Sequence, residues 1–83
     1  MAQTTPNRVD GAALRRVRQQ RGMKPAELVE QVGNLSPQHL RNIETGHRQP
    51  SPELTYRLAR SLGIEVGEIL TDHGRAELAE VTP

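Results

Sequence analysis

Signals that start and stop helices recur at short intervals along this chain, and they constrain its fold more than any other feature. A glycine after an apolar helical stretch ends the helix by adopting a left-handed conformation, and a proline fits the first helical turn, where its missing N–H has no partner. Glycines close four such stretches, at Gly22, Gly33, Gly46 and Gly63. Prolines open three of them, at Pro25, Pro37 and Pro52. The chain is therefore divided into short helices.

Apolar residues between these signals follow the helical period, and no segment alternates with the period of a strand. Asp10, Ser36 and Ser51 stand at the N-cap positions of the first, third and fourth helices. We expect helices over about 11–21, 25–32, 37–45 and 52–62, a short helix or turn within 64–72, and further helical structure over 75–81. The predicted fold class is all-α, with five short helices packed successively around an aliphatic core.

The length of 83 residues corresponds to one small domain, which we place at 10–71, between a flexible N-terminal arm, 1–9, and an acidic C-terminal tail, 72–83. The chain has no Cys, which excludes disulfides and thiolate metal sites and fits a reducing cytoplasm. Its apolar runs are too short to span a membrane, and the N-terminus lacks the apolar region of a secretion signal. We therefore expect a cytoplasmic protein.

The net charge of +1 conceals an uneven distribution of charged residues. Residues 1–63 carry a net charge of +5, whereas residues 64–83 carry −4. A basic body with an acidic tail suits a polyanion that binds one face of the domain. Ordinary solvated surface explains the same charges equally well, so the charge distribution alone leaves the partner open.

The predicted helix over 37–45 has a polar face that packing does not require. Leu40 and Ile43 are its apolar anchors. Its other face carries hydrogen-bonding side chains: Gln38, His39, Arg41, Asn42 and Thr45. A short turn beginning at Gly33 joins it to the preceding helix, which is the arrangement of a helix-turn-helix. The second helix of that motif enters the DNA major groove, where Gln and Asn pair with adenine and Arg with guanine.

The order of residues over about 11–70 resembles the Xre-type (Cro/CI-type) helix-turn-helix family of phage repressors and bacterial regulators. The shared elements run from the first helix to the end of the predicted domain: Leu14, Arg18, Arg21-Gly22, Glu27-Leu28, Gly33, Ser36, Leu40, Ile43-Glu44, Gly46, 50–53, Leu58-Ala59, Leu62-Gly63 and 68–70. The resemblance implies a compact, lambda-repressor-like fold of five helices that binds double-stranded DNA. The chain departs from the family pattern at Lys24-Pro25 and at Pro37, where relatives carry polar side chains that contact DNA.

The resemblance also implies which residues read bases. Gln38 and Asn42 match the main base-reading positions of the family. His39 and Arg41 match flanking positions that contact bases or phosphates. We therefore expect these four side chains to form the base-contacting site.

Contacts with the sugar-phosphate backbone are expected from a second set of residues: Lys24, Ser36, His47, Arg48 and Gln49. For Ser36, capping of the helix is the alternative role. Arg18 and Glu44 match a family pair that forms a largely buried salt bridge between the first and third helices. Arg8, Arg15 and Arg16 are either solvated or approach phosphates from the first helix and the arm, and for Arg15 we expect solvation. Arg57 and Arg60 are expected to be solvated.

These observations predict a sequence-specific transcriptional regulator that acts as a homodimeric repressor on a palindromic operator, because pairing two small modules doubles the contacts with DNA. The alternative is a protein-interaction module of the same fold, which would dock a toxin or polymerase through residues 64–70 and the acidic tail. Catalysis has no support, since no Gly-rich phosphate loop or nucleophile–base arrangement stands out. The histidines lack zinc-site spacing, and we expect no metal, other cofactor or small-molecule ligand.

Overall fold

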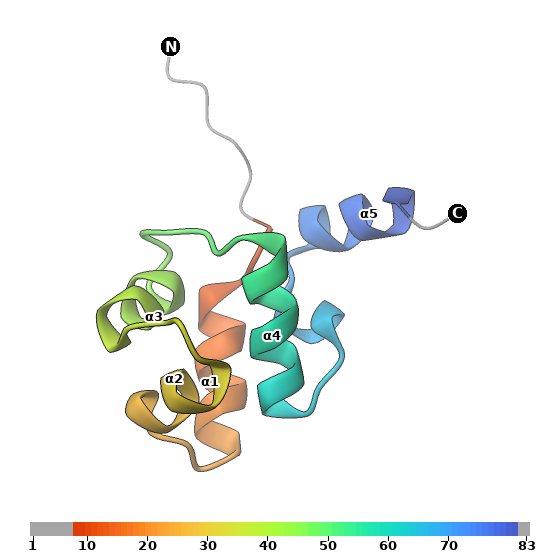
Figure 1. Ribbon diagram of the computed structural model, residues 1–83. Helices are drawn as coiled ribbons and strands as arrows, with labels where there is room; N and C mark the ends of the chain where they lie inside the picture. The colour runs from red at the N-terminus through yellow and green to blue at the C-terminus, as the bar shows by residue number, and fades with distance from the viewer. Residues whose placement is uncertain (1–7, 82–83) are drawn as a thin grey trace.

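The structure, a computed structural model, describes residues 8–81 and consists of helices that follow one another closely along the chain (Figure 1). The elements in chain order are α1 Gly11–Gln20, α2 Pro25–Val32, α3 Pro37–Glu44, α4 Pro52–Leu62, the 3-10 turn η1 Val66–Ile69 and α5 Asp72–Val81. Over the range 8–81, β-type pairing is limited to one antiparallel bridge between Val9 and Leu70. The prediction of an all-α fold with five helices is confirmed.

Local sequence explains where most of the helices begin. The side chains of Asp10, Ser36 and Ser51 each accept a hydrogen bond from the backbone N–H three residues further on, at 3.0–3.2 Å. Each therefore satisfies one of the N–H groups that the first helical turn leaves unpaired. The turn between α2 and α3 needs two successive residues with positive φ, and it uses Gly33 (78°) and Asn34 (53°). Glycine and asparagine are the residues that adopt this conformation at least cost.

The predicted limits differ from the observed ones by one residue at the ends of two helices and by three residues at the start of the last helix. The first and third helices were predicted to end at 21 and 45, but α1 ends at Gln20 and α3 at Glu44. The segment predicted as a short helix or turn forms η1. The last helix starts at Asp72 rather than at residue 75, because the hydroxyl of Thr71 accepts a hydrogen bond from the N–H of Gly74 at 3.0 Å and caps it.

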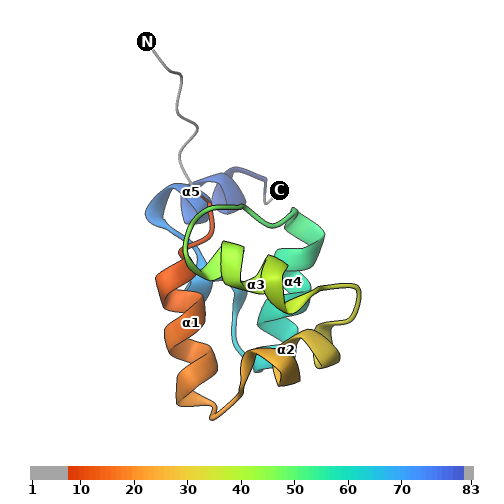
Figure 2. The same cartoon turned by 90° about the vertical axis from the view of Figure 1, so that its left-hand side faces the viewer.

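One aliphatic cluster fills the space between the helices. α2 packs against α3 and α4, α1 packs against α3, and η1 closes the cluster against α1 and α4. The buried members of the cluster are Val9, Leu14, Val17, Leu28, Val29, Val32, Leu40, Ile43, Leu58, Ala59, Leu62, Ile69 and Leu70. Figure 2 shows the consequence for α3, which lies across the front of the domain with α1 and α4 behind it. The core thus holds α3 from one side and leaves its other side open.

The range predicted for the N-terminal arm, 1–9, includes residues that belong to the folded domain. Val9 is only 3% exposed and belongs to the core, and Arg8 accepts a hydrogen bond through its carbonyl from the N–H of Thr71 at 2.8 Å. Gly74 in α5 packs so closely on Arg8 that a side chain there would overlap the Arg8 backbone. Arg8 and Val9 are therefore bound between α5 and the rest of the domain, while the remainder of the predicted arm, 1–7, lies outside the described residues.

Arg57 was expected to be solvated, but its Nη2 donates a 2.9 Å hydrogen bond to the carbonyl of Val32, the last residue of α2. The carbonyls at a helix C-terminus lack intrahelical partners and carry partial negative charge, so this cation caps α2 from α4. We expect Arg57→Ala to lower the free energy of unfolding by roughly 1–2 kcal/mol in urea denaturation. Arg60→Ala, which removes an exposed arginine of the same helix, should change it by less than about 0.5 kcal/mol. Equal effects of the two variants would contradict the capping role.

Candidate nucleic-acid interface

The outer face of α3 carries two side-chain amides one helical turn apart. Gln38 is exposed and Asn42 is half-buried, and the Nε2 of Gln38 donates to the Oδ1 of Asn42 at 3.3 Å. Leu40 and Ile43, on the opposite face, are fully buried and hold the helix to the core. The amides therefore lie on the face of α3 that is turned away from the core. Together they present two NH₂ groups and two carbonyl oxygens, and the bond between them uses only one N–H and one oxygen lone pair.

The other two predicted base-contacting residues lie on α3 beside these amides. Arg41 is exposed and follows Gln38 by three residues, whereas His39 is half-buried and carries its side chain toward the other flank of the helix. All four predicted base-contacting residues therefore come from one helix and are reachable from solvent, with the two amides in the middle.

The loop that follows α3 folds back on the end of the helix. The N–H of Arg48 donates to the carbonyl of Asn42 at 3.1 Å, and Thr45 Oγ1 lies 2.7 Å from His47 Nδ1. Both His47 and Arg48 are exposed. The structure thus places two of the predicted phosphate-contacting side chains next to the C-terminal end of α3.

Gln49 has a different role from the predicted phosphate contact. Its Oε1 accepts hydrogen bonds from the N–H groups of Arg8 (3.1 Å) and Val9 (2.9 Å), and its Nε2 donates to the carbonyl of Val9 at 3.4 Å. Both polar atoms of the amide are thus used inside the domain. Gln49 ties the loop after α3 to the N-terminal segment, and this contact spans 40 residues of sequence.

Lys24 and Ser36 stand at the N-caps of α2 and α3. The backbone N–H of Lys24 donates to Glu27 Oε1 at 2.7 Å. The residue is exposed, so a ligand can reach its ammonium group. The hydroxyl oxygen of Ser36 accepts from the N–H of His39 at 3.0 Å. Ser36 therefore has the capping role that was considered as its alternative, and the residue is exposed.

Beneath α3 lies an ion pair that joins it to α1. Arg18 Nε donates to Glu44 Oε2 at 2.7 Å, and Arg18 Nη2 donates to Glu44 Oε1 at 3.1 Å. The remaining terminal nitrogen of Arg18 donates to the carbonyl of Met23 at 2.8 Å. The two side chains are only 8% and 7% exposed. This bidentate geometry fixes the rotation of α3 relative to α1.

Gly11 also positions α3, although no local pattern in the sequence marks it. A Cβ atom at this position would overlap the carbonyl oxygens of Ile43 and Glu44 at the end of α3. The first turn of α1 therefore touches the last turn of α3 through backbone atoms. Asp10, which precedes Gly11, was predicted as a helix cap, but the close approach depends on two residues more than 30 positions away, Ile43 and Glu44.

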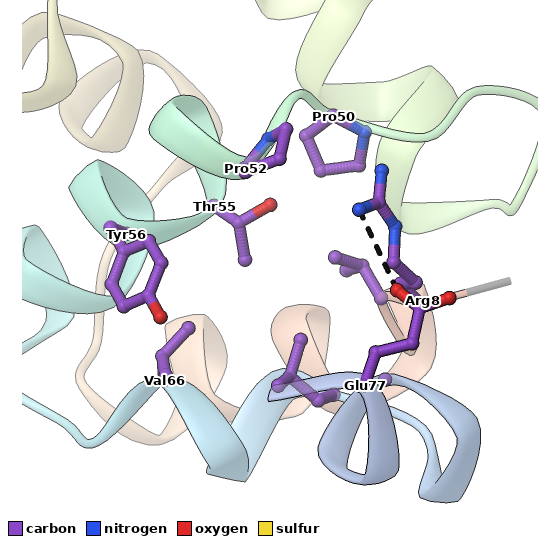
Figure 3. A pocket seen from close by; sticks show the side chains of 10 residues that line it. Arg8, Pro50, Pro52, Thr55, Tyr56, Val66 and Glu77 are labelled. Atoms are coloured by element: carbon purple, nitrogen blue, oxygen red, sulfur yellow. Dashed lines mark ion pairs between the residues drawn. The ribbon is translucent and has the colours of Figure 1, made fainter. Parts of the chain in front are cut away.

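A concave surface away from α3 is mainly apolar. It is a groove of about 250 Å³ between the start of α4, the N-terminal segment and α5 (Figure 3). Tyr56 and Val66 line one side of it, and Arg8 lies across from them and pairs with Glu77 at 3.7 Å. Since Arg8 has a carboxylate partner, this groove offers no uncompensated charge to a polyanion.

Residues 8–81 contain neither a membrane-spanning helix nor a cluster of metal ligands. No helix in this part of the chain is long and apolar enough to cross a membrane. The same residues contain no group of three or more His, Cys, Asp or Glu side chains that could hold a metal ion.

Comparison with known proteins relates the chain to transcriptional regulators. A family model described as helix-turn-helix matches residues 14–69. An uncharacterized HTH-type transcriptional regulator of Sinorhizobium fredii, y4dJ, is 34% identical over 61 residues, which cover 74% of this chain and 78% of that protein.

Solved structures agree with this relationship. The restriction-modification controller protein C.AhdI from Aeromonas hydrophila is similar with a TM-score of 0.67 and 31% identity, over 70% of this chain and 86% of that one. The clp gene regulator ClgR from Corynebacterium glutamicum is similar with a TM-score of 0.65 and 32% identity, over 88% of this chain and 87% of that one.

Proposed function

This chain belongs to the Xre (Cro/CI-type) helix-turn-helix family of DNA-binding transcriptional regulators, and from that premise we propose that it is a sequence-specific repressor that binds a palindromic operator as a homodimer in the cytoplasm. The observation that carries the proposal is the outward face of α3, where the amides of Gln38 and Asn42 stand side by side and no core contact uses them. Each amide can pair bidentately with adenine in the major groove.

The surroundings of α3 support a division between reading and positioning. The ammonium group of Lys24 and the side chains of His47 and Arg48 lie at the two ends of the motif, where they can contact phosphates on either side of the groove. Phosphate contacts fix the orientation of a protein on the duplex but carry no sequence information, whereas the amides of α3 supply the base contacts. The Arg18–Glu44 pair holds the reading helix at a constant angle.

The homodimer is proposed because one domain of this size buries little surface on DNA. Two copies related by a two-fold axis would place two α3 helices in successive major grooves, with half-sites about 10 base pairs apart. Footprinting of the DNA upstream of the gene should therefore reveal an inverted repeat protected on one face. Repression follows if this repeat overlaps the promoter, and a transcription assay with purified polymerase measures it directly.

The test of base reading is the replacement of either amide. We expect Gln38→Ala or Asn42→Ala to weaken binding to the operator by roughly 1–3 kcal/mol, with little change in binding to an unrelated duplex. Gln20→Ala, which removes an exposed glutamine at the end of α1, is the matched control and should bind like the wild type. Fluorescence anisotropy with both duplexes measures the difference. Unchanged operator preference in both amide variants would rule out base reading by α3.

A protein-interaction module of the same fold is the second candidate, and one observation favours it. Tyr56, which is 48% exposed, is the large hydrophobic residue that lies most open on the described surface, and it borders the apolar groove. In that case Tyr56→Ser would abolish binding of the protein partner, while Gln38→Ala and Asn42→Ala would leave that binding intact. The opposite pattern supports DNA reading.

A further inference from the structure

A hollow of about 430 Å³, lined by both polar and apolar residues, lies between α1, the start of α2 and one flank of α3. Its lining includes three arginines, Arg15, Arg18 and Arg41, and two of the polar residues of α3, Gln38 and Thr45. The hollow therefore adjoins the face of α3 that carries the amides. The prediction that Arg15 is merely solvated took no account of this neighbourhood, which exists only because α1 packs against α3.

The positive charge in this hollow is only partly compensated. Glu44 also lines it, but both of its carboxylate oxygens are bound by Arg18, at 2.7 and 3.1 Å. Arg15 and Arg41 are exposed, and neither forms an ion pair with any carboxylate of residues 8–77. Two guanidinium groups from different helices thus border one concave surface without a counter-charge.

Other arginines of the domain also lack an ion pair with the described carboxylates, but none of them lines the hollow: Arg16, Arg21, Arg48 and Arg60. Arg8 is paired with Glu77, Arg75 with Asp72, and Arg57 donates to the carbonyl of Val32. An exposed arginine on the same helix as Arg15, Arg16, does not line the hollow. Unpaired guanidinium groups that border one concave surface favour a planar or tetrahedral oxyanion, because the guanidinium fork matches its oxygens bidentately.

We propose that Arg15 and Arg41 clamp a phosphate group of the DNA backbone in this hollow when α3 enters the major groove. The inference rests on the proposed function, because it takes the ligand to be the duplex that α3 reads. It assigns Arg41 to the backbone, whereas the family resemblance left base and phosphate contacts open for it. It also makes Arg15 a DNA contact, so that α1 takes part in binding as well as in holding α3.

The experiment compares three single variants, Arg15→Ala, Arg41→Ala and Arg16→Ala, on two duplexes. One duplex is selected by the wild-type protein from a random library, and the other is the same sequence scrambled. Affinity is measured by fluorescence anisotropy between 50 and 200 mM salt, and circular dichroism confirms that each variant is folded. For every phosphate that a protein neutralises, the slope of log affinity against log salt changes by about 0.9.

We expect Arg15→Ala and Arg41→Ala each to weaken binding to both duplexes by the same factor and to reduce the salt slope by less than about 1, because the remaining guanidinium still faces the phosphate. The double variant Arg15→Ala/Arg41→Ala should reduce the slope by about 1, since the two groups neutralise one phosphate between them. Arg15→Lys should keep the slope, since it keeps the charge. Arg16→Ala should retain the wild-type slope, because Arg16 lies outside the hollow.

Two results would overturn the clamp while leaving the proposed function intact. The first is an Arg15→Ala variant that matches Arg16→Ala in slope and affinity. The second is an Arg41→Ala variant that binds the scrambled duplex as tightly as before but loses the preference for the selected one, since Arg41 would then read a base. If the wild-type protein selects no sequence and binds without salt dependence, the proposed function fails, and the clamp fails with it.

Discussion

Replacing Glu44 by Ala is expected to lower the free energy of unfolding by about 3–5 kcal/mol, because it strands the buried charge of Arg18. Arg18 is 8% exposed, and two of its three hydrogen-bonding contacts end on the Glu44 carboxylate. The third, to the carbonyl of Met23, does not neutralise the charge. In a domain of this size each kcal/mol lost corresponds to a fall in Tm of about 4–8 °C, so the effect is visible in a thermal melt.

Two control variants separate the loss of the partner from the loss of a carboxylate. Glu53→Ala removes an exposed carboxylate from the first turn of α4 and should cost less than about 1 kcal/mol. The double variant Arg18→Met/Glu44→Leu removes both charges and should recover most of the lost stability, because a well-packed apolar pair often replaces a buried ion pair without cost. A Glu44→Ala protein that melts at the wild-type temperature would contradict the buried pair.

If the ion pair serves chiefly to orient α3, the double variant should reveal it in DNA binding. Its fold would be intact, but α3 would lose the bidentate contact that fixes its rotation relative to α1. We therefore expect the double variant to bind the operator more weakly than the wild type at equal stability. Anisotropy titrations of the two folded proteins measure this difference.

Gly11→Val is expected to destabilise the domain by about 3 kcal/mol, at the upper end of what overpacking costs. The atoms in the way are the carbonyl oxygens of Ile43 and Glu44, which are backbone atoms at the end of α3. They cannot swing aside as a flexible side chain can, so α1 and α3 must separate. The displacement would also disturb the ion pair, since Glu44 is one of the two residues in contact.

Ala12→Val is the matched control for this substitution. Ala12 follows Gly11 in α1 and is exposed, so valine there meets no neighbour and costs only the difference in helix propensity, about 0.5 kcal/mol. Urea denaturation of the two variants gives the comparison. Similar stabilities for Gly11→Val and Ala12→Val would show that α1 and α3 do not approach each other as closely as described.

Much of the fold was determined by short-range signals in the sequence. Ser36 caps α3 and Gly33 turns the chain before it because each acts on backbone groups within a few residues, whatever the rest of the molecule does. Leu40 and Ile43 were predicted as the anchors of α3 from helical spacing alone, and both are fully buried. The outward position of Gln38 and Asn42 follows from the same periodicity, because a helix buried on one face exposes the other.

Tertiary structure decided the contacts that join distant segments. Val9 was assigned to a flexible arm because no local pattern marks a single valine as core. It is nevertheless buried, and its backbone pairs with that of Leu70, which follows η1. The amide of Gln49, a predicted phosphate contact, binds the backbone of that same N-terminal segment, which no local pattern indicated. Arg57 and Arg15 were both expected to be solvated. Arg57 instead donates to the last residue of α2, and Arg15 borders the hollow beside α3, because of the way the helices pack.

The physical reason for this division is the range of the interactions. Caps, turns and helical periodicity depend on neighbours in the chain, so the sequence by itself determined where the helices lie and which face of α3 is polar. Whether a given arginine, glutamine or valine finds a partner depends on which helices meet, and that is fixed by the packing of the whole core. For this protein the sequence determined the polar face of α3, and only the tertiary structure decided what holds α3 in place and which cations stand beside it.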